Sequence, residues 1–463
     1  MVSLGADSHA PWRQSLLVVR ARPWRPKQTE AQGARRKRRA QEFSRGTKLP
    51  ISLKTNDRGE TNPGTKLPFR RRPVGRADDI FTAQDRGPKG FSAACWKAAI
   101  LDGAFEPRGA ARVDWKRKMA KLGVGVVGVG TLGKRHADNL RHSVPGVQLV
   151  AVSDSDAKRA SQVASELEIE HSYGSIEALV ERDDVQAVVV ASPSKYHASG
   201  IRVAAESGKD VFCEKPLALA LDEADEALNA VAKAGVRLQI GFMRRYDPAY
   251  VNARNRIEAG EIGDPVIFKS VGRDKEPPPP SFLQRNVNGT LFSDAAIHDF
   301  DLVRWLMGDE VAAVHCFAGL LACPELAEFN DVDACLVNLR LARGGIGNVE
   351  AFRKSTYGYD IRTEILGTKG ALHVGYLQHT ADSILTGAGI LCDVVDHWLA
   401  RFADAYLDEM RSFVGAILAD KPVQPGGEDG RHALAVALAA EQSFKESRPV
   451  TLAEVPSGPP HTS

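Results

Sequence analysis

The sequence predicts an α/β protein with two folded domains, a doubly wound parallel sheet followed by an α/β domain with a large, mostly antiparallel open sheet. Between residues 119 and 241, apolar strand patterns alternate with helical patterns, which is typical of a parallel sheet. Strand patterns then follow one another with few helical patterns between them, which is typical of antiparallel pairing. The 463 residues supply enough chain for two such domains. We assign residues 242–452 to the second domain and residues 453–463 to a tail.

The first 118 residues differ in composition from the rest of the chain. They contain 27 Lys and Arg against 11 Asp and Glu, whereas residues 119–463 contain 34 against 47. The segment has basic runs such as Arg35–Arg39 and no sustained helical or strand period, so we expect it to be disordered. It is either a nucleic-acid-binding arm or targeting sequence, or a stretch without function that precedes a true start at Met119. The acidic balance of the folded part argues against nucleic acid as its partner.

Composition also limits the setting in which the protein works. No run of 18 apolar residues is present, so we expect no transmembrane helix and no membrane partner. The six cysteines show no CxxC or paired zinc-ligand spacing, so we expect no metal site. They are typical of reduced, mostly buried thiols in a cytoplasmic protein.

A glycine motif follows the first strand pattern of the folded part. The apolar run Leu122–Val127 leads directly into G-x-G-x-x-G, and a helical segment comes next. In this context the glycines permit a tight turn and a close approach of the backbone to a pyrophosphate, which the free N–H groups of the helix N-terminus bind. The motif therefore predicts a dinucleotide-binding Rossmann domain, with cofactor contacts from Gly128, Gly130, Thr131, Leu132 and Gly133.

An aspartate at the end of the second strand pattern predicts which dinucleotide binds. Asp154 lies 21 residues beyond Gly133, where a carboxylate accepts hydrogen bonds from the adenosine ribose and repels a 2′-phosphate. The next three residues include no arginine. We therefore expect NAD to be preferred to NADP.

Two later strand patterns, Val185–Ser192 and Asp210–Pro216, end in polar residues. Ligands of doubly wound sheets bind at the carboxyl ends of the strands, so Ser192, Pro193 and Glu214 are candidate cofactor contacts. Lys215 would lie there beside the nicotinamide, and its alternative role is a solvated lysine at the start of a loop. His197 would either contact the nicotinamide ribose or cap a helix.

A second polar pair lies in the stretch Arg285–Gly308. Asp294 and His298 are four residues apart in a helical pattern, and residues i and i+4 share one helix face. The imidazole could accept a proton while the carboxylate orients it. The alternative is an ordinary ion pair on a helix surface.

Seven segments, in this order, closely resemble the glucose–fructose oxidoreductase/inositol dehydrogenase (Gfo/Idh/MocA) family and within it the inositol 2-dehydrogenase branch. They are GVVGVGTLGKRHADNL, ASPSKYHA, CEKPLAL, GFMRRYDPAY, RDKEPPPPSFL, DAAIHDFDLVRWLMG and YGYDIRTEILGTKGAL. The resemblance covers residues 121–452 and none of residues 1–118. It implies a Rossmann domain, a C-terminal α/β domain whose open sheet packs against other subunits of a homotetramer, and NAD-dependent oxidation of the axial C2 hydroxyl of myo-inositol to scyllo-inosose.

The resemblance also assigns roles to individual residues. The lysine of the EKP motif matches Lys215, and the Asp and His of the D-x-x-x-H motif match Asp294 and His298. In this assignment His298 is the base, because its intrinsic pKa near 6.5 suits proton transfer. Asp294 supports His298, and Lys215 stabilises the developing alkoxide. The substrate contacts implied are Arg245 and Tyr357, although structural roles for both stay open. Arg273 and Asp274 are further candidate substrate contacts, because they precede four prolines, a stiff extended segment that could line the pocket.

One departure from the family pattern concerns the loop before the catalytic segment. Relatives tend to have a glycine pair there, whereas this chain has Asn286-Val287-Asn288-Gly289, which leaves the polyol preference open. Another inositol isomer, a pyranose sugar or an amino-inositol is an alternative substrate. Some relatives bind the dinucleotide and act as regulators without turnover. Such a regulator could dispense with Lys215, Asp294 or His298, whereas this chain keeps all three.

Overall fold

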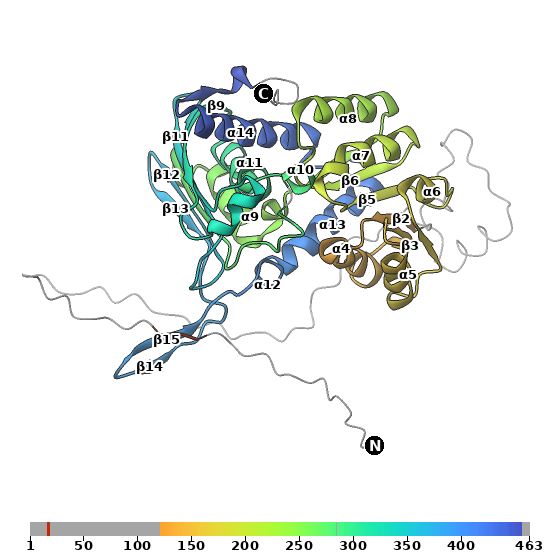
Figure 1. Ribbon diagram of the computed structural model, residues 1–463, viewed down its shortest axis with the longest axis horizontal. Helices are drawn as coiled ribbons and strands as arrows, with labels where there is room; N and C mark the ends of the chain where they lie inside the picture. The colour runs from red at the N-terminus through yellow and green to blue at the C-terminus, as the bar shows by residue number, and fades with distance from the viewer. Residues whose placement is uncertain (1–15, 19–120, 284, 456–463) are drawn as a thin grey trace, which may run out of the picture. The chain divides into compact units, whose positions relative to one another are not determined.

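The computed structural model describes residues 16–18, 121–283 and 285–455, and Figure 1 traces the chain through them. The predictions made for residues 1–118, apart from the three residues 16–18, and for residues 456–463 of the tail lie outside the described residues. Three residues of the extension form β1 (Leu16–Val18), which pairs antiparallel with β15 (Gly389–Asp393). None of the described helices combines the length and the hydropathy that a membrane-spanning segment needs.

The first domain is the predicted parallel sheet, with strand order β4-β3-β2-β5-β6-β7. Its strands are β2 (Leu122–Val127), β3 (Val147–Ser153), β4 (His171–Tyr173), β5 (Ala187–Val190), β6 (Asp210–Glu214) and β7 (Leu238–Gly241). Its helices are α4 (Thr131–His142), α5 (Ala157–Glu166), α6 (Ile176–Val180), η2 (Ser194–Tyr196), α7 (His197–Glu206) and α8 (Leu221–Ala234). All neighbouring strands are parallel, so the carboxyl ends of β2, β3, β5 and β6 meet at one edge.

Helices cover both faces of this sheet, as Figure 1 shows. One core joins α4 and α5 to the sheet, through Leu140 and Val163 among others. The opposite core contains Ile201 of α7 and Ala224 of α8. This two-sided cover explains why β5, the run Ala187–Val190, is entirely apolar and fully buried.

The second domain is built on a seven-stranded sheet with the order β13-β12-β8-β11-β10-β9-β16, in which only the neighbours β8 and β11 are parallel. Its strands are β8 (Pro265–Arg273), β9 (Val311–Gly319), β10 (Ala334–Leu341), β11 (Ile346–Phe352), β12 (Asp360–Gly367), β13 (Ala371–Val374) and β16 (Val450–Thr451). The predicted fold class, with a mostly antiparallel open sheet, is confirmed.

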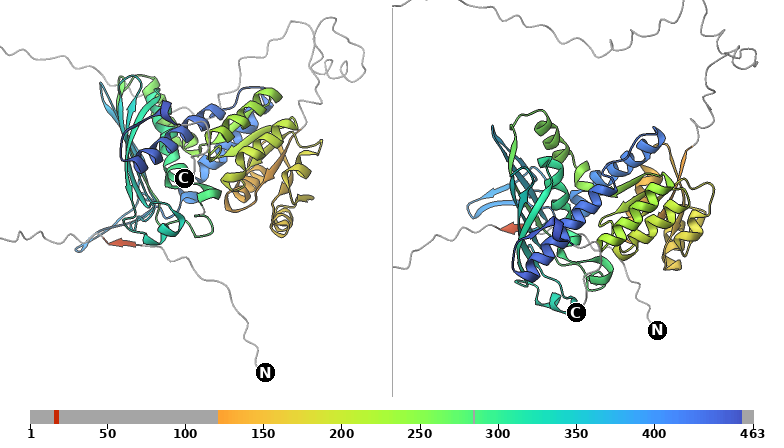
Figure 2. Two further views of the ribbon diagram at one scale, coloured as in Figure 1. Left: turned by 45° about the horizontal axis from the view of Figure 1, so that its top comes forward. Right: turned by 90° about the horizontal axis from the view of Figure 1, so that it is seen from above.

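Helices cover one face of this second sheet, which Figure 2 shows nearly edge-on. The helical segments after β7 are η3 (Met243–Tyr246), α9 (Pro248–Glu258), α10 (Arg285–Asn288), η4 (Phe292–Ala296), α11 (Ile297–Met307), η5 (Pro324–Phe329), α12 (Trp398–Arg401), α13 (Ala403–Leu418), α14 (Gly427–Glu446) and η6 (Leu452–Glu454). Tyr250 of α9, Phe300 of α11 and Val436 of α14 pack with Phe268 of β8 in one core. The other face leaves Phe317 63% exposed.

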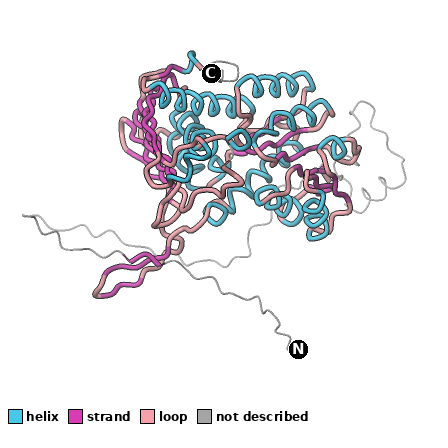
Figure 3. Tube along the Cα trace, viewed as in Figure 1, coloured by secondary structure: helices cyan, strands magenta, loops and turns pink. Residues whose placement is uncertain are grey.

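The last part of the second domain contains three separate helices, α12, α13 and α14, and Figure 3 colours the helices cyan and the loops between them pink. Pro and Gly in the segment 420–426 end α13 and separate it from α14. Met410 and Phe413 of α13 return to the core of the first domain beside α4. A hairpin of β14 (Ile384–Thr386) and β15 precedes these helices.

Candidate active site

The glycine motif forms a tight turn between β2 and α4. Gly128 has a φ of +81°, and a Cβ built there would lie 2.5 Å from the Ser192 nitrogen. A Cβ on Gly133 would lie 1.8 Å from the Gly128 carbonyl oxygen. These two glycines are therefore required by the packing of the protein itself. A Cβ on Gly130 would meet nothing within 4 Å, which leaves open space beside the N-terminus of α4 for a pyrophosphate.

Asp154 lies at the carboxyl end of β3 and is 9% exposed. One carboxylate oxygen accepts a hydrogen bond from the Val129 amide at 3.0 Å, and the other accepts one from the Asp156 amide at 2.9 Å. The side chain therefore ties the glycine turn to the end of β3, where the predicted ribose contact lies. Arg159, five residues on, places its Nε 3.8 Å from Asp154.

The ends of β5 and β6 are held together by His197. Its Nδ1 lies 2.7 Å from the Pro216 carbonyl oxygen and its Nε2 lies 2.7 Å from the Ser192 carbonyl oxygen. Both ring nitrogens therefore face backbone acceptors, so His197 connects the loop after β5 to the loop after β6, the two loops predicted to contact the cofactor. Its imidazole is 2% exposed.

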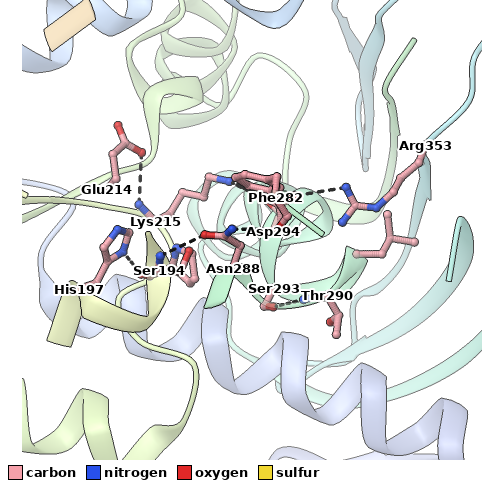
Figure 4. Close-up of polar contacts among 12 residues, drawn as sticks. Ser194, His197, Glu214, Lys215, Phe282, Asn288, Thr290, Ser293, Asp294 and Arg353 are labelled. Atoms are coloured by element: carbon pink, nitrogen blue, oxygen red, sulfur yellow. Dashed lines mark hydrogen bonds and ion pairs between the residues drawn. The ribbon is translucent and has the colours of Figure 1, made fainter. Parts of the chain in front are cut away.

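Lys215 and Asp294 meet between the two domains. The Lys215 ammonium donates to the Asp294 backbone oxygen at 2.7 Å and to its carboxylate at 3.0 Å. Arg353 donates to the other carboxylate oxygen of Asp294 at 3.3 Å, so the carboxylate lies between two cations, as Figure 4 shows. Burial would raise the pKa of Asp294, but these cations outweigh that effect and lower it.

Asp294 and His298 are separated by an irregular turn. The segment η4 is a single π-helical turn, and α11 begins after it. A π turn changes the angular spacing of a regular helix, and no hydrogen bond or ion pair joins Asp294 to His298. Asp294 binds Lys215 and Arg353, and within the described part of the chain His298 Nδ1 has no hydrogen-bond partner.

His298 lies in a surrounding that favours its neutral form. It is 7% exposed, and its ring lies edge-on to Phe242 with centroids 6.2 Å apart. Burial, followed by the positive charges of Lys215 and Arg244, lowers the pKa of His298 well below its ordinary value. A neutral imidazole at physiological pH is able to accept a proton.

The other predicted substrate contacts fall into two groups. Arg273 donates to Glu350 at 2.5 Å and to the Tyr357 hydroxyl, and this hydroxyl donates to Asp360 at 2.7 Å. Asp274 follows β8, and the charged groups that act on it are Arg353, Asp294, Lys215 and Arg244. Arg273, Asp274 and Tyr357 therefore lie near the end of β8.

Arg245 lies outside this group. Its guanidinium donates to Asp301 at 2.8 Å and to Asp429 at 3.0 Å. This network joins η3, α11 and α14. The contacts favour the structural role that the sequence left open for Arg245.

Three polar residues of the site were not predicted from the sequence. Arg353 is 1% exposed and directly follows β11, which is parallel to β8, so its position at a strand end was a usable signal. Arg244 is buried in an ion pair of 2.7 Å with Asp299. The Asn288 side chain accepts from the Ser194 amide at 3.4 Å and donates to the Phe282 carbonyl at 2.8 Å, and no local pattern signals these contacts.

Two family descriptions match the two domains. "Oxidoreductase family, NAD-binding Rossmann fold" matches residues 122–242. "GFO/IDH/MocA C-terminal domain" matches residues 250–373. The first match ends directly after β7 of the parallel sheet, and the second begins before β8 of the open sheet.

Relatives and solved structures resemble the chain over both domains. The NAD(+)-dependent scyllo-inositol 2-dehydrogenase of Bacillus subtilis is 40% identical over 71% of this chain and 95% of its own. The myo-inositol 2-dehydrogenase of Thermotoga maritima is 35% identical over 72% of this chain and 99% of its own. The scyllo-inositol dehydrogenase of Lactobacillus casei, crystallised with NAD(H) and scyllo-inositol, matches 72% of this chain and all of its own with a TM-score of 0.69 and 30% identity.

Proposed function

Since the chain belongs to the GFO/IDH/MocA oxidoreductase family, we propose that it uses NAD to oxidise the axial C2 hydroxyl of myo-inositol to a ketone, scyllo-inosose. The observation that carries this proposal is the placement of Lys215 and His298. The strand end after β6 presents an ammonium held at 3.0 Å by Asp294, and the positive charge of this ammonium acts on the buried imidazole of His298.

Each side chain has a separate task in this reaction. NAD supplies the acceptor for the hydride that leaves C2. Lys215 donates a hydrogen bond to the C2 oxygen and stabilises its developing negative charge. His298 accepts the hydroxyl proton, which its lowered pKa permits because the imidazole is neutral before the reaction. Asp294, held by Arg353, fixes the Lys215 ammonium in place.

Scyllo-inositol is a second candidate substrate, favoured by the 40% identity to a scyllo-inositol 2-dehydrogenase. The two isomers differ only in configuration at C2, so oxidation at this carbon gives the same ketone. A spectrophotometric screen for NADH across inositol isomers and pyranose sugars separates the candidates. We expect the fastest NADH formation with myo-inositol. Turnover restricted to sugars would contradict the proposal.

The cofactor preference is expected to depend on Asp154. Its carboxylate would bind the ribose 2′-hydroxyl and repel the 2′-phosphate of NADP, so kcat/KM should be higher with NAD. Asp154→Ala should narrow the gap between the cofactors, and it should also weaken NAD binding because the Val129 amide loses its acceptor. Asp138→Ala, at an exposed carboxylate of α4, serves as the control. Equal turnover of the unmodified protein with NADP would contradict this assignment.

Substrate affinity is expected to rise with pH around pH 6. Burial, opposed mainly by Arg353, raises the pKa of Asp274 to about 6, so Asp274 is a neutral acid below this pH and a carboxylate above it. As a carboxylate it can accept hydrogen bonds from polyol hydroxyls. The KM for myo-inositol should therefore fall as pH rises from 5 to 7, and Asp274→Asn should remove this change. If the KM for myo-inositol still falls between pH 5 and pH 7 in Asp274→Asn, another ionisable group causes the pH dependence.

The chain is expected to form homotetramers through the uncovered face of the second sheet. Phe317 of β9 and Leu336 of β10 are direct cross-strand partners on this face and are 63% and 46% exposed. Such an apolar pair favours association. Light scattering should give four chains for the unmodified protein and fewer for Phe317→Asp. A monomeric unmodified protein would contradict the expectation.

We further propose that the protein works in the cytoplasm. The described cysteines, Cys213, Cys316, Cys323, Cys335 and Cys392, are free thiols. Reduced thiols and a dinucleotide cofactor are typical of that compartment. A regulator without turnover is disfavoured because Lys215, Asp294 and His298 are all retained.

A further inference from the structure

Three ionisable side chains are buried behind the strand end that carries Lys215. They are His136 of α4, Glu214 at the end of β6 and Glu409 of α13, which are 0%, 4% and 0% exposed. His136 Nε2 lies 2.7 Å from Glu214 Oε1 and 3.9 Å from Glu409 Oε1. We call these three residues the buried triad.

The buried triad has few partners for its charges. Within the described part of the chain, both carboxylate oxygens of Glu409 and the Nδ1 of His136 have no hydrogen-bond partner. The rings of Phe212 and Tyr406 pack edge-on to the imidazole. Two ionised carboxylates beside one imidazole would leave a net negative charge in this apolar surrounding, which is costly unless a proton or a cation neutralises it.

The distances favour a proton over a metal ion. Two ligand atoms bound to one tetrahedral Zn²⁺ at ~2.0–2.1 Å lie roughly 3.3 Å apart. The 2.7 Å between His136 Nε2 and Glu214 Oε1 is instead the length of a charge-assisted hydrogen bond. Burial, and then the nearby Glu214 carboxylate, also raise the pKa of Glu409 well above its usual value.

We propose that the buried triad is a positioning device for Lys215, in which Glu409 is a neutral carboxylic acid and His136 holds the Glu214 carboxylate. Glu214 Oε2 accepts a hydrogen bond from the Lys215 amide at 3.3 Å, so the carboxylate fixes the backbone of the lysine, as Figure 4 shows. The space is reserved for this carboxylate, because a Cβ on Gly241 would lie 2.9 Å from it.

The buried triad also joins the two binding regions of the site. His136 lies on α4, whose N-terminus follows the glycine turn, while Glu214 directly precedes Lys215. The Gln239 side chain donates to the Glu409 backbone oxygen at 3.2 Å and connects α13 to β7. The contact between His136 and Glu214 therefore links α4, the helix expected to bind the phosphates, to the strand end that carries Lys215. This inference rests on the proposed role of Lys215.

Infrared spectroscopy of the full chain tests the protonation state of Glu409, and this test does not depend on which reaction the protein catalyses. At pH 8, where Asp274 is ionised, the unmodified protein should show the carbonyl stretch of a protonated carboxylic acid, and Glu409→Gln should lack this contribution. Because an amide resembles a neutral carboxyl group, Glu409→Gln should also fold. No such band, or a Glu409→Gln protein that fails to fold, would overturn the proposal. So would one equivalent of tightly bound metal per chain in elemental analysis of the purified protein.

Kinetics with myo-inositol and NAD test the positioning. His136→Leu should lower kcat at least about tenfold while the KM for myo-inositol and the Kd for NAD change less than about threefold. His136→Gln, which keeps a donor for Glu214, should recover most of kcat and remains informative if His136→Leu does not fold. An unchanged kcat in a folded His136→Leu protein, or no recovery in His136→Gln, would overturn the positioning role. A lack of inositol oxidation in the unmodified protein would instead overturn the proposed function, while the infrared result would still stand.

Discussion

Replacement of Lys215 by Met is expected to lower kcat for myo-inositol oxidation roughly 10²–10³-fold, the usual cost of removing a donor that stabilises a developing oxyanion. Methionine keeps the apolar stem of the side chain but removes the ammonium that Asp294 holds at 3.0 Å. The Kd for NAD should change only a few fold, because the ammonium is assigned chiefly to the substrate oxygen. Steady-state kinetics and NAD titration by fluorescence measure the two effects.

Lys209→Met is the matched control for this variant. Lys209 precedes the other end of β6, and its ammonium donates to the Arg182 backbone oxygen at 3.0 Å. The control should keep near-normal kcat. If Lys215→Met also kept near-normal kcat, the lysine would have no part in the chemistry.

Replacement of His298 by Ala is expected to lower the rate of oxidation roughly 10²–10⁴-fold, which is the usual contribution of a positioned general base. NAD affinity should barely change, because the imidazole is assigned to the substrate hydroxyl. In the unmodified protein, ionisation of His298 should not make the rate change with pH near pH 6.5, because its lowered pKa leaves the imidazole neutral there. The rate should fall only when the pH drops through this lowered pKa and the imidazole becomes protonated.

His432→Ala provides the comparison for His298→Ala. His432 lies on α14, and its Nδ1 contacts the Glu428 carbonyl oxygen at 2.7 Å. Its loss should leave the rate unchanged. Near-normal oxidation by His298→Ala with myo-inositol still bound would mean that the proton leaves by another route.

Features that depend on local sequence could be predicted. The glycine turn, Asp154 and Lys215 each lie directly after a strand, and parallel strands bring such positions to one edge of a sheet. The antiparallel sheet followed from consecutive strand patterns with few helical patterns between them. The resemblance to a known family supplied the pairing of Lys215 with Asp294 and His298.

Features that depend on contacts between distant segments could not be predicted. The spacing of Asp294 and His298 predicted a hydrogen bond between them, but η4 is a π turn and the Asp294 carboxylate binds Lys215 and Arg353 instead. Arg353 and Asp294 come together only because β11 and η4 are packed in one domain. Glu409 reaches Glu214 because α13 returns to the first domain, and its helical pattern alone does not say which sheet it covers.

Transfer of deuterium from C2 of myo-inositol to the cofactor tests the central claim most directly. The protein would be incubated with NAD and C2-deuterated myo-inositol, and the reduced cofactor would be analysed by mass spectrometry. We predict one deuterium at C4 of the reduced nicotinamide with the unmodified protein, and a correspondingly slower appearance of this label with Lys215→Met and His298→Ala. Reduced cofactor without deuterium, or no reduction of NAD with any inositol isomer, would contradict the account.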